Sequence, residues 1–394
     1  MGSSETDLKT LSVNYYDVLG VGPTVDQATV RKAYRRLAQK HHPDVSSHPE
    51  AHENMARINE AFQTLMDPAR RAEYDAFLRG GGIDPAEVSR ADLKKPVVVK
   101  LRSRLKAHLT PVYAVAFTPD TGQLVSSAFD NELIWWSREE RPERRLKLDN
   151  GVISVLRAFP EERLVAAGSA ENQISFWHLN GERVESWKAS NEEWVSCLAI
   201  SADGNSLATG SLHHTLSVSN THNGQLNYRK LDHEDAVTSV AWSANGKFLA
   251  TGGGDATVHI LNGATGTLIQ TIKQIRSTVT AMAFSPDARY LAIAGVDLSI
   301  RIFRLKDGLM EKMVYGHTKP IEALAFHPNS WLIASGSRDG TVGLWNAAKG
   351  IGNVRIDASS RPISCVAFSP DGELLATGGQ DKLVRLWDVT AKDA

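Results

Sequence analysis

The chain has 394 residues, of which 42% are hydrophobic and 23% charged, a soluble composition with room for more than one domain. Its 44 Lys and Arg nearly balance its 45 Asp and Glu, so the overall charge favours neither nucleic acid nor an anionic membrane as a partner. The absence of a run of ~18 apolar residues or a signal-peptide core, together with two isolated cysteines, predicts a cytoplasmic protein.

The first predicted elements are two helices joined by a short loop. Residues 27–41 carry apolar residues at helical spacing, with Asp26 as the N-cap, and Pro43 ends this helix. A second helix is predicted over residues 51–66, flanked by shorter helices at residues 17–19 and 69–78. The pattern therefore predicts a small all-α bundle built on a helical hairpin.

Three segments in this region occur in a family-specific order, namely YYDVLGV, VRKAYRRLAQKHHPD and INEAFQTLMDPARRAEYD. Together they resemble the J domain of the DnaJ family, and the resemblance covers residues 14–75. Met55 departs from the family pattern, which usually has Phe there, but a core can accommodate this exchange. The resemblance predicts a J domain at residues 14–79, preceded by a flexible N-terminus at residues 1–13.

The resemblance implies an activity, because J domains dock on DnaK-type 70-kDa heat-shock chaperones and stimulate their ATP hydrolysis. A rigid loop with one carboxylate beside a cationic helix suits a directional ion pair. The implied stimulating loop is His42, Pro43 and Asp44. The implied docking residues are Arg31, Lys32, Arg35 and Arg36, with Arg70 and Arg71 as secondary contacts.

Three other interpretations of these residues remain open. The basic helix face is by itself most often a solvated surface, and a J fold can lose its activity. His41, His42 and His48 suggest a metal site, but neither cysteines nor regular ligand spacing accompany them. We therefore predict no metal site.

A linker at residues 80–95 begins with three glycines. It is too short for the Gly/Phe-rich and zinc-binding regions of the DnaJ layout, so client binding must come from elsewhere. The side chains of residues 97–105 then alternate in type with a period of two, as in a β-strand. Six cations between Lys94 and Lys106 suggest nucleic-acid binding, but an exposed strand that discourages edge pairing is the favoured explanation.

Internal repetition governs the remaining chain. A strand of the form V-x-x-V-A-F begins at Val112, Val152, Val195, Val237, Val279, Ile321 and Ile363, in steps of 40–43 residues. Turns and further strands follow each copy, as propeller blades require. SGSRDGTVGLWN and TGGQDKLVRLWD resemble WD repeats. We predict an all-β seven-bladed propeller at residues 96–394, its last blade completed by residues 97–105.

Some polar residues in the repeats suggest a hydrolase. However, equivalent residues recur at the same spacing in two blades, which favours the structural hydrogen-bond tetrad that WD repeats contain. A third blade has Thr377, Asp381 and Trp387 without a matching His. The predicted tetrads are His108, Ser126, Asp130 and Trp136, and His317, Ser335, Asp339 and Trp345.

WD propellers hold partner proteins on the face around the central channel, so the resemblance implies a partner-binding face here. An aromatic side chain at such a place is a typical interface anchor, although single exposed aromatics are common on any surface. The positions that match this face are Trp194, Phe129, Leu212, Arg338 and Gln380.

The leading hypothesis is a non-enzymatic co-chaperone whose propeller binds a client or a complex, while the J domain recruits a DnaK-type chaperone. Its alternative is a WD-repeat scaffold in which the J domain only docks. An enzymatic propeller is the third and weakest hypothesis, because an unrepeated catalytic cluster is missing. A phosphate-binding loop is also missing, so we expect neither a cofactor nor a small-molecule substrate.

Overall fold

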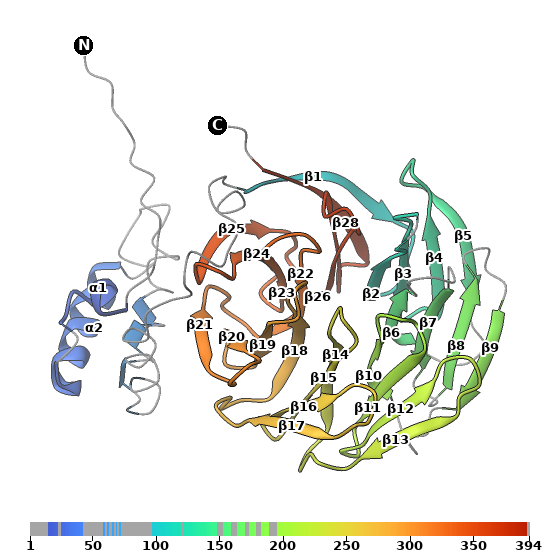
Figure 1. The fold of residues 1–394 in the computed structure, drawn as a ribbon. Coiled ribbons are helices and arrows are strands. Elements are labelled where there is room, and N and C mark those ends of the chain that lie inside the picture. The colour runs from blue at the N-terminus through green and yellow to red at the C-terminus, as the bar shows by residue number, and fades with distance from the viewer. Residues whose placement is uncertain are drawn as a thin grey trace. The chain divides into compact units, whose positions relative to one another are not determined.

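The computed structural model describes residues 15–22, 25–41, 58–59, 61–62, 65–66, 68, 71, 97–119, 121–147, 153–158, 164–169, 173–178, 183–188 and 195–391. The chain forms two compact units, with the main division after residue 83 (Figure 1). Neither helix in the described part has the length and hydropathy needed to cross a bilayer.

The N-terminal unit contains helices α1 (Tyr15–Leu19) and α2 (Gln27–His41). The amide of Thr29 donates a hydrogen bond to Asp26 Oδ1 at 2.9 Å, which confirms Asp26 as the N-cap of α2. The Tyr34 ring stacks on Phe62 with ring centroids 3.9 Å apart. The described core of the unit consists of Tyr16, Leu19, Val30, Ala33, Ile58, Ala61 and Leu65.

The second unit consists of four-stranded antiparallel sheets, and its described residues form seven of them. The first four sheets are β2 (Val112–Phe117), β3 (Leu124–Ala128), β4 (Glu132–Trp136) and β5 (Pro142–Lys147); β6 (Ile153–Ala158), β7 (Leu164–Ser169), β8 (Gln173–His178) and β9 (Arg183–Lys188); β10 (Val195–Ile200), β11 (Ser206–Ser211), β12 (Leu216–Asn220) and β13 (Leu226–Lys230); β14 (Val237–Trp242), β15 (Phe248–Gly253), β16 (Val258–Asn262) and β17 (Leu268–Ile272).

The remaining sheets are β18 (Val279–Phe284), β19 (Tyr290–Gly295), β20 (Ile300–Arg304) and β21 (Met310–Val314); β22 (Ile321–Phe326), β23 (Leu332–Ser337), β24 (Thr341–Asn346) and β25 (Ile351–Asp357); and β26 (Ile363–Phe368), β27 (Leu374–Gly379), β28 (Leu383–Ala391) and β1 (Val97–Lys106). In the last sheet β1 pairs antiparallel with β28, from Val97 opposite Ala391 to Lys106 opposite Leu383. Two segments far apart in sequence thus share one sheet.

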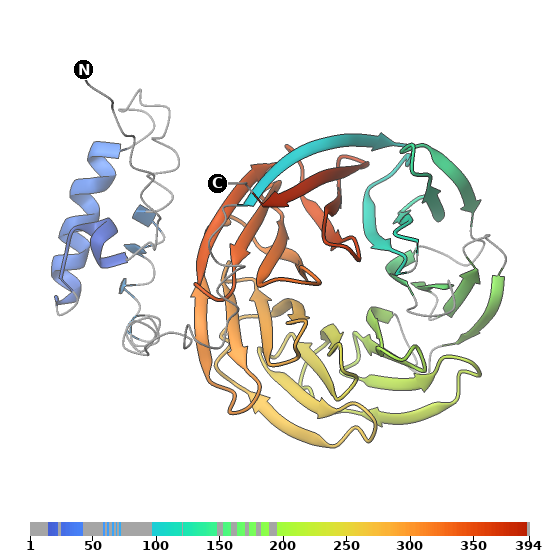
Figure 2. The same ribbon diagram turned by 45° about the horizontal axis from the view of Figure 1, so that its top comes forward.

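Each sheet packs face to face on the next, and the last packs on the first, so the sheets circle a common axis (Figure 2). A separate apolar cluster fills each of these contacts. The cluster between the last and first sheets contains Cys365 and Leu386 on one side and Val112 and Trp136 on the other. The prediction of a β-propeller after the helical unit is confirmed.

Glycines in the second strands allow neighbouring sheets to approach closely. A Cβ atom added to Gly210 would lie 2.6 Å from Val237 Cγ1 of the next sheet. A Cβ on Gly378 would lie equally close to Val112 Cγ1, across the contact between the last and first sheets. The recurring A-T-G sequence therefore reflects a packing requirement of the ring.

The register of one first strand corrects the sequence prediction. We expected this strand to begin at Val152, but Ile153 pairs with Ser169 in the way that Val112 pairs with Ala128. Each described first strand then has a bulge before its third residue, which shifts the apolar alternation by one. With β6 beginning at Ile153, the first strands recur every 41 or 42 residues.

The cations of β1 lie on its outer side. Lys100, Arg102, Arg104 and Lys106 are exposed, whereas Leu105 is buried. Arg102 Nε forms an ion pair with Asp388 Oδ1 of β28 at 2.9 Å. Charged side chains on the outer side of this strand can discourage edge pairing with another chain.

Candidate partner-binding sites

Four cationic side chains occupy one side of α2, namely those of Arg31, Lys32, Arg35 and Arg36. All four are exposed, whereas Val30 on the opposite side is fully buried. Residues one turn apart lie above one another on a helix, so the four charges form a single patch. Within the described part of the chain none of them has an ionic partner, and the patch can therefore attract an acidic surface.

Arg71, predicted as a secondary chaperone contact, lies within the N-terminal unit. Its Nε donates to the Tyr16 hydroxyl at 3.1 Å, and its Nη2 donates to the Val25 carbonyl at 2.5 Å. The guanidinium carbon also lies 5.5 Å from the centroid of the Tyr16 ring. Arg71 thus links α1 to the residues that precede α2, a structural role that the sequence did not indicate.

Several predicted site residues cannot be placed. His42, Pro43, Asp44 and Arg70 of the J domain lie outside the described residues. The same holds for Trp194 on the propeller. Their roles remain predictions from the sequence.

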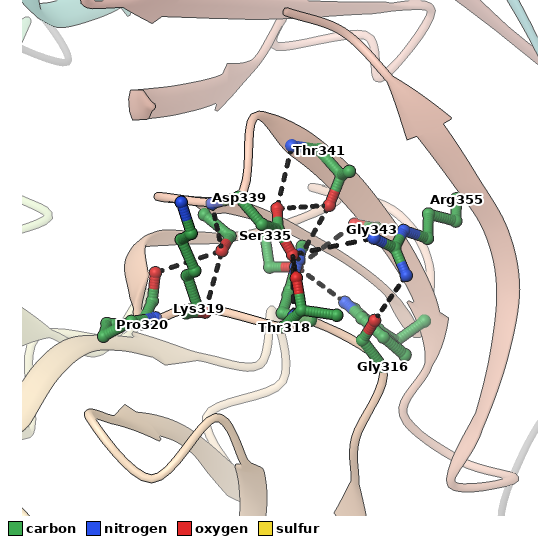
Figure 3. Close-up of polar contacts among 12 residues, drawn as sticks. Gly316, Thr318, Lys319, Pro320, Ser335, Asp339, Thr341, Gly343 and Arg355 are labelled. Carbon is green, nitrogen blue, oxygen red and sulfur yellow. Dashed lines mark hydrogen bonds and ion pairs between the residues drawn. The ribbon is translucent and has the colours of Figure 1, made fainter. Parts of the chain in front are cut away.

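The predicted tetrad of His317, Ser335, Asp339 and Trp345 is built around Ser335 (Figure 3). Its Oγ lies 2.6 Å from His317 Nε2 and accepts a hydrogen bond from Trp345 Nε1 at 2.8 Å. On the other side of the imidazole, Nδ1 lies 3.2 Å from Asp339 Oδ2 and 2.9 Å from Thr341 Oγ1. The network ties β23 and β24 to the loop that precedes β22.

The protons of this network follow from the charge of Asp339. Burial by itself would raise the pKa of Asp339, but hydrogen bonds from His317 and Thr341 outweigh burial and hold it well below its ordinary value. The carboxylate is therefore ionised and can accept a proton from His317 Nδ1. Ser335 is fully buried, so this set cannot meet a substrate as a hydrolytic triad would.

The other predicted tetrad, that of His108, has the same arrangement. His108 Nε2 lies 2.8 Å from Ser126 Oγ, Trp136 Nε1 donates to the same oxygen at 2.8 Å, and His108 Nδ1 lies 3.4 Å from Asp130 Oδ2. Burial lowers the pKa of His108 despite the nearby Asp130 carboxylate, which keeps the imidazole neutral in its tetrad.

A third such set was not predicted from the sequence. His233 Nε2 lies 2.9 Å from Thr251 Oγ1, and Nδ1 lies 3.0 Å from Asp255 Oδ2. The separations of 18 and 22 residues are the same as in the other two sets, and this spacing would have found it. Leu261 stands where the others have Trp, so the triad lacks the indole donor.

Other sheets replace the histidine. In the sheet of β26–β28, Ser359 Oγ donates to Asp381 Oδ2 at 2.7 Å, and Trp387 Nε1 donates to Thr377 Oγ1 at 3.0 Å. Arg385 also donates to Asp381, at 2.5 Å. This sheet thus retains the aspartate of the turn while changing its partner.

One group of side chains could also hold a cation. Ligand atoms of His108, Asp130 and Glu132 lie within 4.8 Å of one another. His108 and Asp130 already serve the tetrad, and Asp130 also accepts the Leu109 amide at 3.0 Å. Glu132 lies 3.6 Å from Arg145 Nη1. These protein partners account for the group's arrangement.

Three of the predicted partner-binding residues of the propeller share one structural position. The amides of Phe129, Arg338 and Gln380 each donate to the carbonyl just before the first strand of their own sheet, at 3.1, 2.9 and 2.9 Å. Phe129 and Leu212 are 52% and 49% exposed, and Arg338 and Gln380 are also exposed. Val296 has the same position, is 45% exposed and was not predicted.

Phe129 is part of a larger exposed surface. Its ring centroid lies 5.9 Å from that of Tyr113, which is 40% exposed. Leu109, in the same sheet's preceding loop, is 74% exposed. Arg338 forms an ion pair with Glu322. This end of the ring therefore offers both apolar and charged groups, as partner-binding surfaces do.

Comparisons with known proteins agree with both units. Residues 14–75 match the family model of the DnaJ domain. Residues 99–137, 181–218, 310–346 and 353–388 match the WD domain, G-beta repeat. Residues 225–287 match the model of the anaphase-promoting complex subunit 4 WD40 domain.

Similar curated proteins match over short segments. The chaperone protein DnaJ of Limosilactobacillus reuteri (strain DSM 20016) is 48% identical over 68 residues, 17% of this chain and 18% of that protein. DnaJ of Dictyoglomus thermophilum is 47% identical over 64 residues, 16% of each chain. The curved DNA-binding protein of Pseudomonas putida (strain W619) is 46% identical over 69 residues, 18% and 22% of the two chains. The matches thus span less than a quarter of these relatives' length. This chain joins a DnaJ domain at residues 14–75 to a propeller of WD repeats.

Proposed function

We propose that this protein is a co-chaperone that stimulates ATP hydrolysis by a DnaK-type 70-kDa heat-shock chaperone. The observation that carries the proposal is the exposed cationic patch of Arg31, Lys32, Arg35 and Arg36 on α2. The helix bearing it ends at His41, immediately before the His-Pro-Asp sequence within the DnaJ match.

The physical basis is attraction followed by a directional contact. Arginine and lysine side chains without acidic neighbours accelerate the encounter with an acidic partner surface. The carboxylate of Asp44 would then be presented beside the docked helix, where it can form a charge-assisted hydrogen bond with the chaperone. The protein would itself bind no nucleotide and catalyse no reaction.

We further propose that the propeller holds a client or places the protein in a complex. The exposed side chains of Phe129, Leu212 and Arg338 support this role. In the same proposal the seven sheets are the complete set of blades, closed by β1, and the protein acts in the cytoplasm.

The test is the steady-state ATPase rate of a DnaK-type chaperone with the wild-type protein and with three variants. His42→Gln changes the loop. Arg31→Glu combined with Arg35→Glu reverses two charges of the α2 patch. Arg144→Glu combined with Lys147→Glu makes the same charge change on the exposed strand β5 and is the matched control.

We expect the wild-type protein and the β5 control to stimulate hydrolysis, and His42→Gln to abolish it. The α2 variant should need at least several-fold more protein for half-maximal stimulation, and the difference should shrink at high salt because the patch acts through screened charges. Stimulation that His42→Gln leaves intact would refute the proposal. Binding without stimulation would identify the protein as a scaffold that uses its J domain only for docking.

A further inference from the structure

Three apolar side chains form an exposed patch at one end of the sheet of β2–β5. They are Leu109, Tyr113 and Phe129, termed the apolar patch. The amide of Phe129 donates to the Pro111 carbonyl at 3.1 Å, and the amide of Leu109 donates to Asp130 Oδ2 at 3.0 Å. These bonds hold the two loops of the patch together, so the apolar patch is preformed.

Tyr113 replaces a residue that joins neighbouring sheets elsewhere in the ring. It is the second residue of β2, as Ser196 is of β10 and Thr238 is of β14. The hydroxyls of Ser196 and Thr238 donate to the carbonyls of Val237 and Val279 in the next sheet, both at 2.5 Å. The ring of Tyr113 instead lies beside Phe129 and is exposed. The contacts between sheets therefore do not account for a tyrosine here.

Four exposed cationic side chains lie at the same end of the two preceding sheets. Lys319 lies in the loop before β22, Arg361 in the loop before β26, and Lys382 in the turn before β28. Lys106 ends β1, opposite Leu383 at the start of β28. Within the described part of the chain none of these four side chains has an ionic or hydrogen-bonding partner. They are termed the cationic sector.

Most acidic side chains near the cationic sector are already engaged. Asp339 and Asp381 belong to the polar networks of their own sheets, and Glu322 forms an ion pair with Arg338. Asp357, at the end of β25, is exposed and offsets one of the four positive charges. The cationic sector therefore keeps an excess of positive charge that can attract an acidic group.

The cationic sector and the apolar patch belong to one continuous surface. Lys106 and Leu109 lie in the same connection between β1 and β2, and the sheet that β1 completes packs on the sheet of β2–β5. The amide of Ser359, in the loop that carries Arg361, donates to the Gly340 carbonyl of the preceding sheet at 2.9 Å. Backbone contacts therefore fix the cations and the apolar groups relative to one another.

We propose that this surface binds an acidic segment of a partner protein that carries an apolar anchor residue. The anchor packs on the apolar patch, as aromatic groups do at the centres of interfaces. The carboxylates on either side of the anchor face the cationic sector and steer the encounter. This inference rests on the proposed partner-binding role of the propeller and specifies the chemistry of the segment that it holds.

Cations beside aromatic rings can also bind a single-stranded nucleic acid, but two observations favour a protein segment. Asp232, Glu234 and Asp235 are exposed at the same end of the sheet of β14–β17, where they would repel a phosphate backbone that continued across the face. Leu109, the most exposed member of the apolar patch, has no aromatic ring on which a base could stack.

The experiment measures the binding of labelled probes to the full chain by fluorescence anisotropy. The main probe is a fluorescein-labelled peptide of sequence EEDFELDE. EEDSESDE keeps its charge and lacks the apolar residues, whereas KKNFKLNK keeps the apolar residues and reverses the charge. A labelled oligothymidylate of about eight nucleotides tests for nucleic acid.

Two variants alter the proposed surface. Arg361→Glu combined with Lys382→Glu reverses two charges of the cationic sector. Tyr113→Ala combined with Phe129→Ala removes both rings of the apolar patch. Circular dichroism of the strand band establishes that each variant is folded.

Two matched controls make the same changes elsewhere on the propeller. Lys247→Glu combined with Lys306→Glu reverses exposed charges in turns at the other end of the sheets. Leu268→Ala combined with Ile269→Ala removes exposed apolar groups from the outer strand β17.

We expect the wild-type protein to bind EEDFELDE more tightly than any of the other three probes. Reversing the charges of Arg361 and Lys382 should weaken binding about tenfold at low salt, and this difference should shrink at high salt. Removing the rings of Tyr113 and Phe129 should weaken it about tenfold at either salt concentration. Both control variants should bind as the wild type does.

The contrary outcomes are distinct. If KKNFKLNK binds more tightly than EEDFELDE and depends on Tyr113 and Phe129, the propeller face binds partners but the inference of an acidic segment is wrong. Tighter binding of the oligothymidylate overturns it in favour of nucleic acid. Binding of EEDFELDE that the controls weaken as much as the site variants, or no binding of it at all, also overturns it. The chaperone ATPase assay tests the co-chaperone proposal separately, because its readout does not involve these probes.

Discussion

Replacing Ser335 by alanine tests how much one tetrad stabilises the propeller. The change removes the oxygen that accepts the Trp345 indole proton at 2.8 Å and the hydroxyl that faces His317 Nε2 at 2.6 Å. Ser335, His317 and Trp345 are all buried, so water does not readily replace the lost partner. Each of the two orphaned groups costs about 1–3 kcal/mol, which predicts a loss of about 2–6 kcal/mol.

The assay is urea unfolding of the full chain, followed by circular dichroism of the strand band. Ser335→Thr keeps the hydroxyl, as Thr251 does beside His233, and should recover most of the loss. Ser360→Ala is the matched control, because Ser360 is exposed, and should change stability by less than about 0.5 kcal/mol. A loss below about 1 kcal/mol for Ser335→Ala, at an unchanged denaturant slope, would refute this account of the tetrad.

Three further predictions concern other contacts. Folding lowers the pKa of the Asp339 carboxyl from its ordinary value of 3.8, so its ionised form stabilises the native state above pH 3.8, and this stabilisation is lost as the pH falls below 3.8. The Asp339→Asn variant should therefore be less stable than the wild type at pH 7. It should also lose less stability between pH 6 and pH 3 in the same unfolding assay. Leu105→Ala should cost about 2–4 kcal/mol because Leu105 is buried at 4% exposure, whereas Leu101→Ala, at 38% exposure, should cost under half as much; equal losses would contradict the packing of β1. Arg71→Gln should destabilise the N-terminal unit by about 1–3 kcal/mol, measured as faster amide hydrogen exchange in α2. Replacing the exposed Arg35 by Gln should have little effect on this exchange. A larger increase in exchange for Arg35→Gln than for Arg71→Gln would exclude a structural role for Arg71.

The sequence predicted features that depend on local chemistry or on repetition. Asp26 was identified as an N-cap because its carboxylate bonds to an amide only three residues away. The role of Arg71 could not be found in this way, since its acceptor on Tyr16 lies 55 residues away. Only the packing of the helical unit brings the two together.

Two predictions for the propeller were wrong because each relied on a single marker residue. His233 was missed because Leu261 replaces the tryptophan that identified the other tetrads. The first strand of the second sheet was placed one residue early because Val152 and Ile153 are both apolar and the bulge removes a strict alternation.

The pairing of β1 with β28 also sets the order in which the propeller can mature during synthesis. Thr390 Oγ1 donates to the Val98 carbonyl across 292 residues of chain. At about 5–20 residues per second, a ribosome needs roughly 15–60 s to make that interval. Throughout this time β1 has no partner strand, and the charges of Lys100, Arg102 and Arg104 on its outer side would discourage a nascent neighbour from pairing with it.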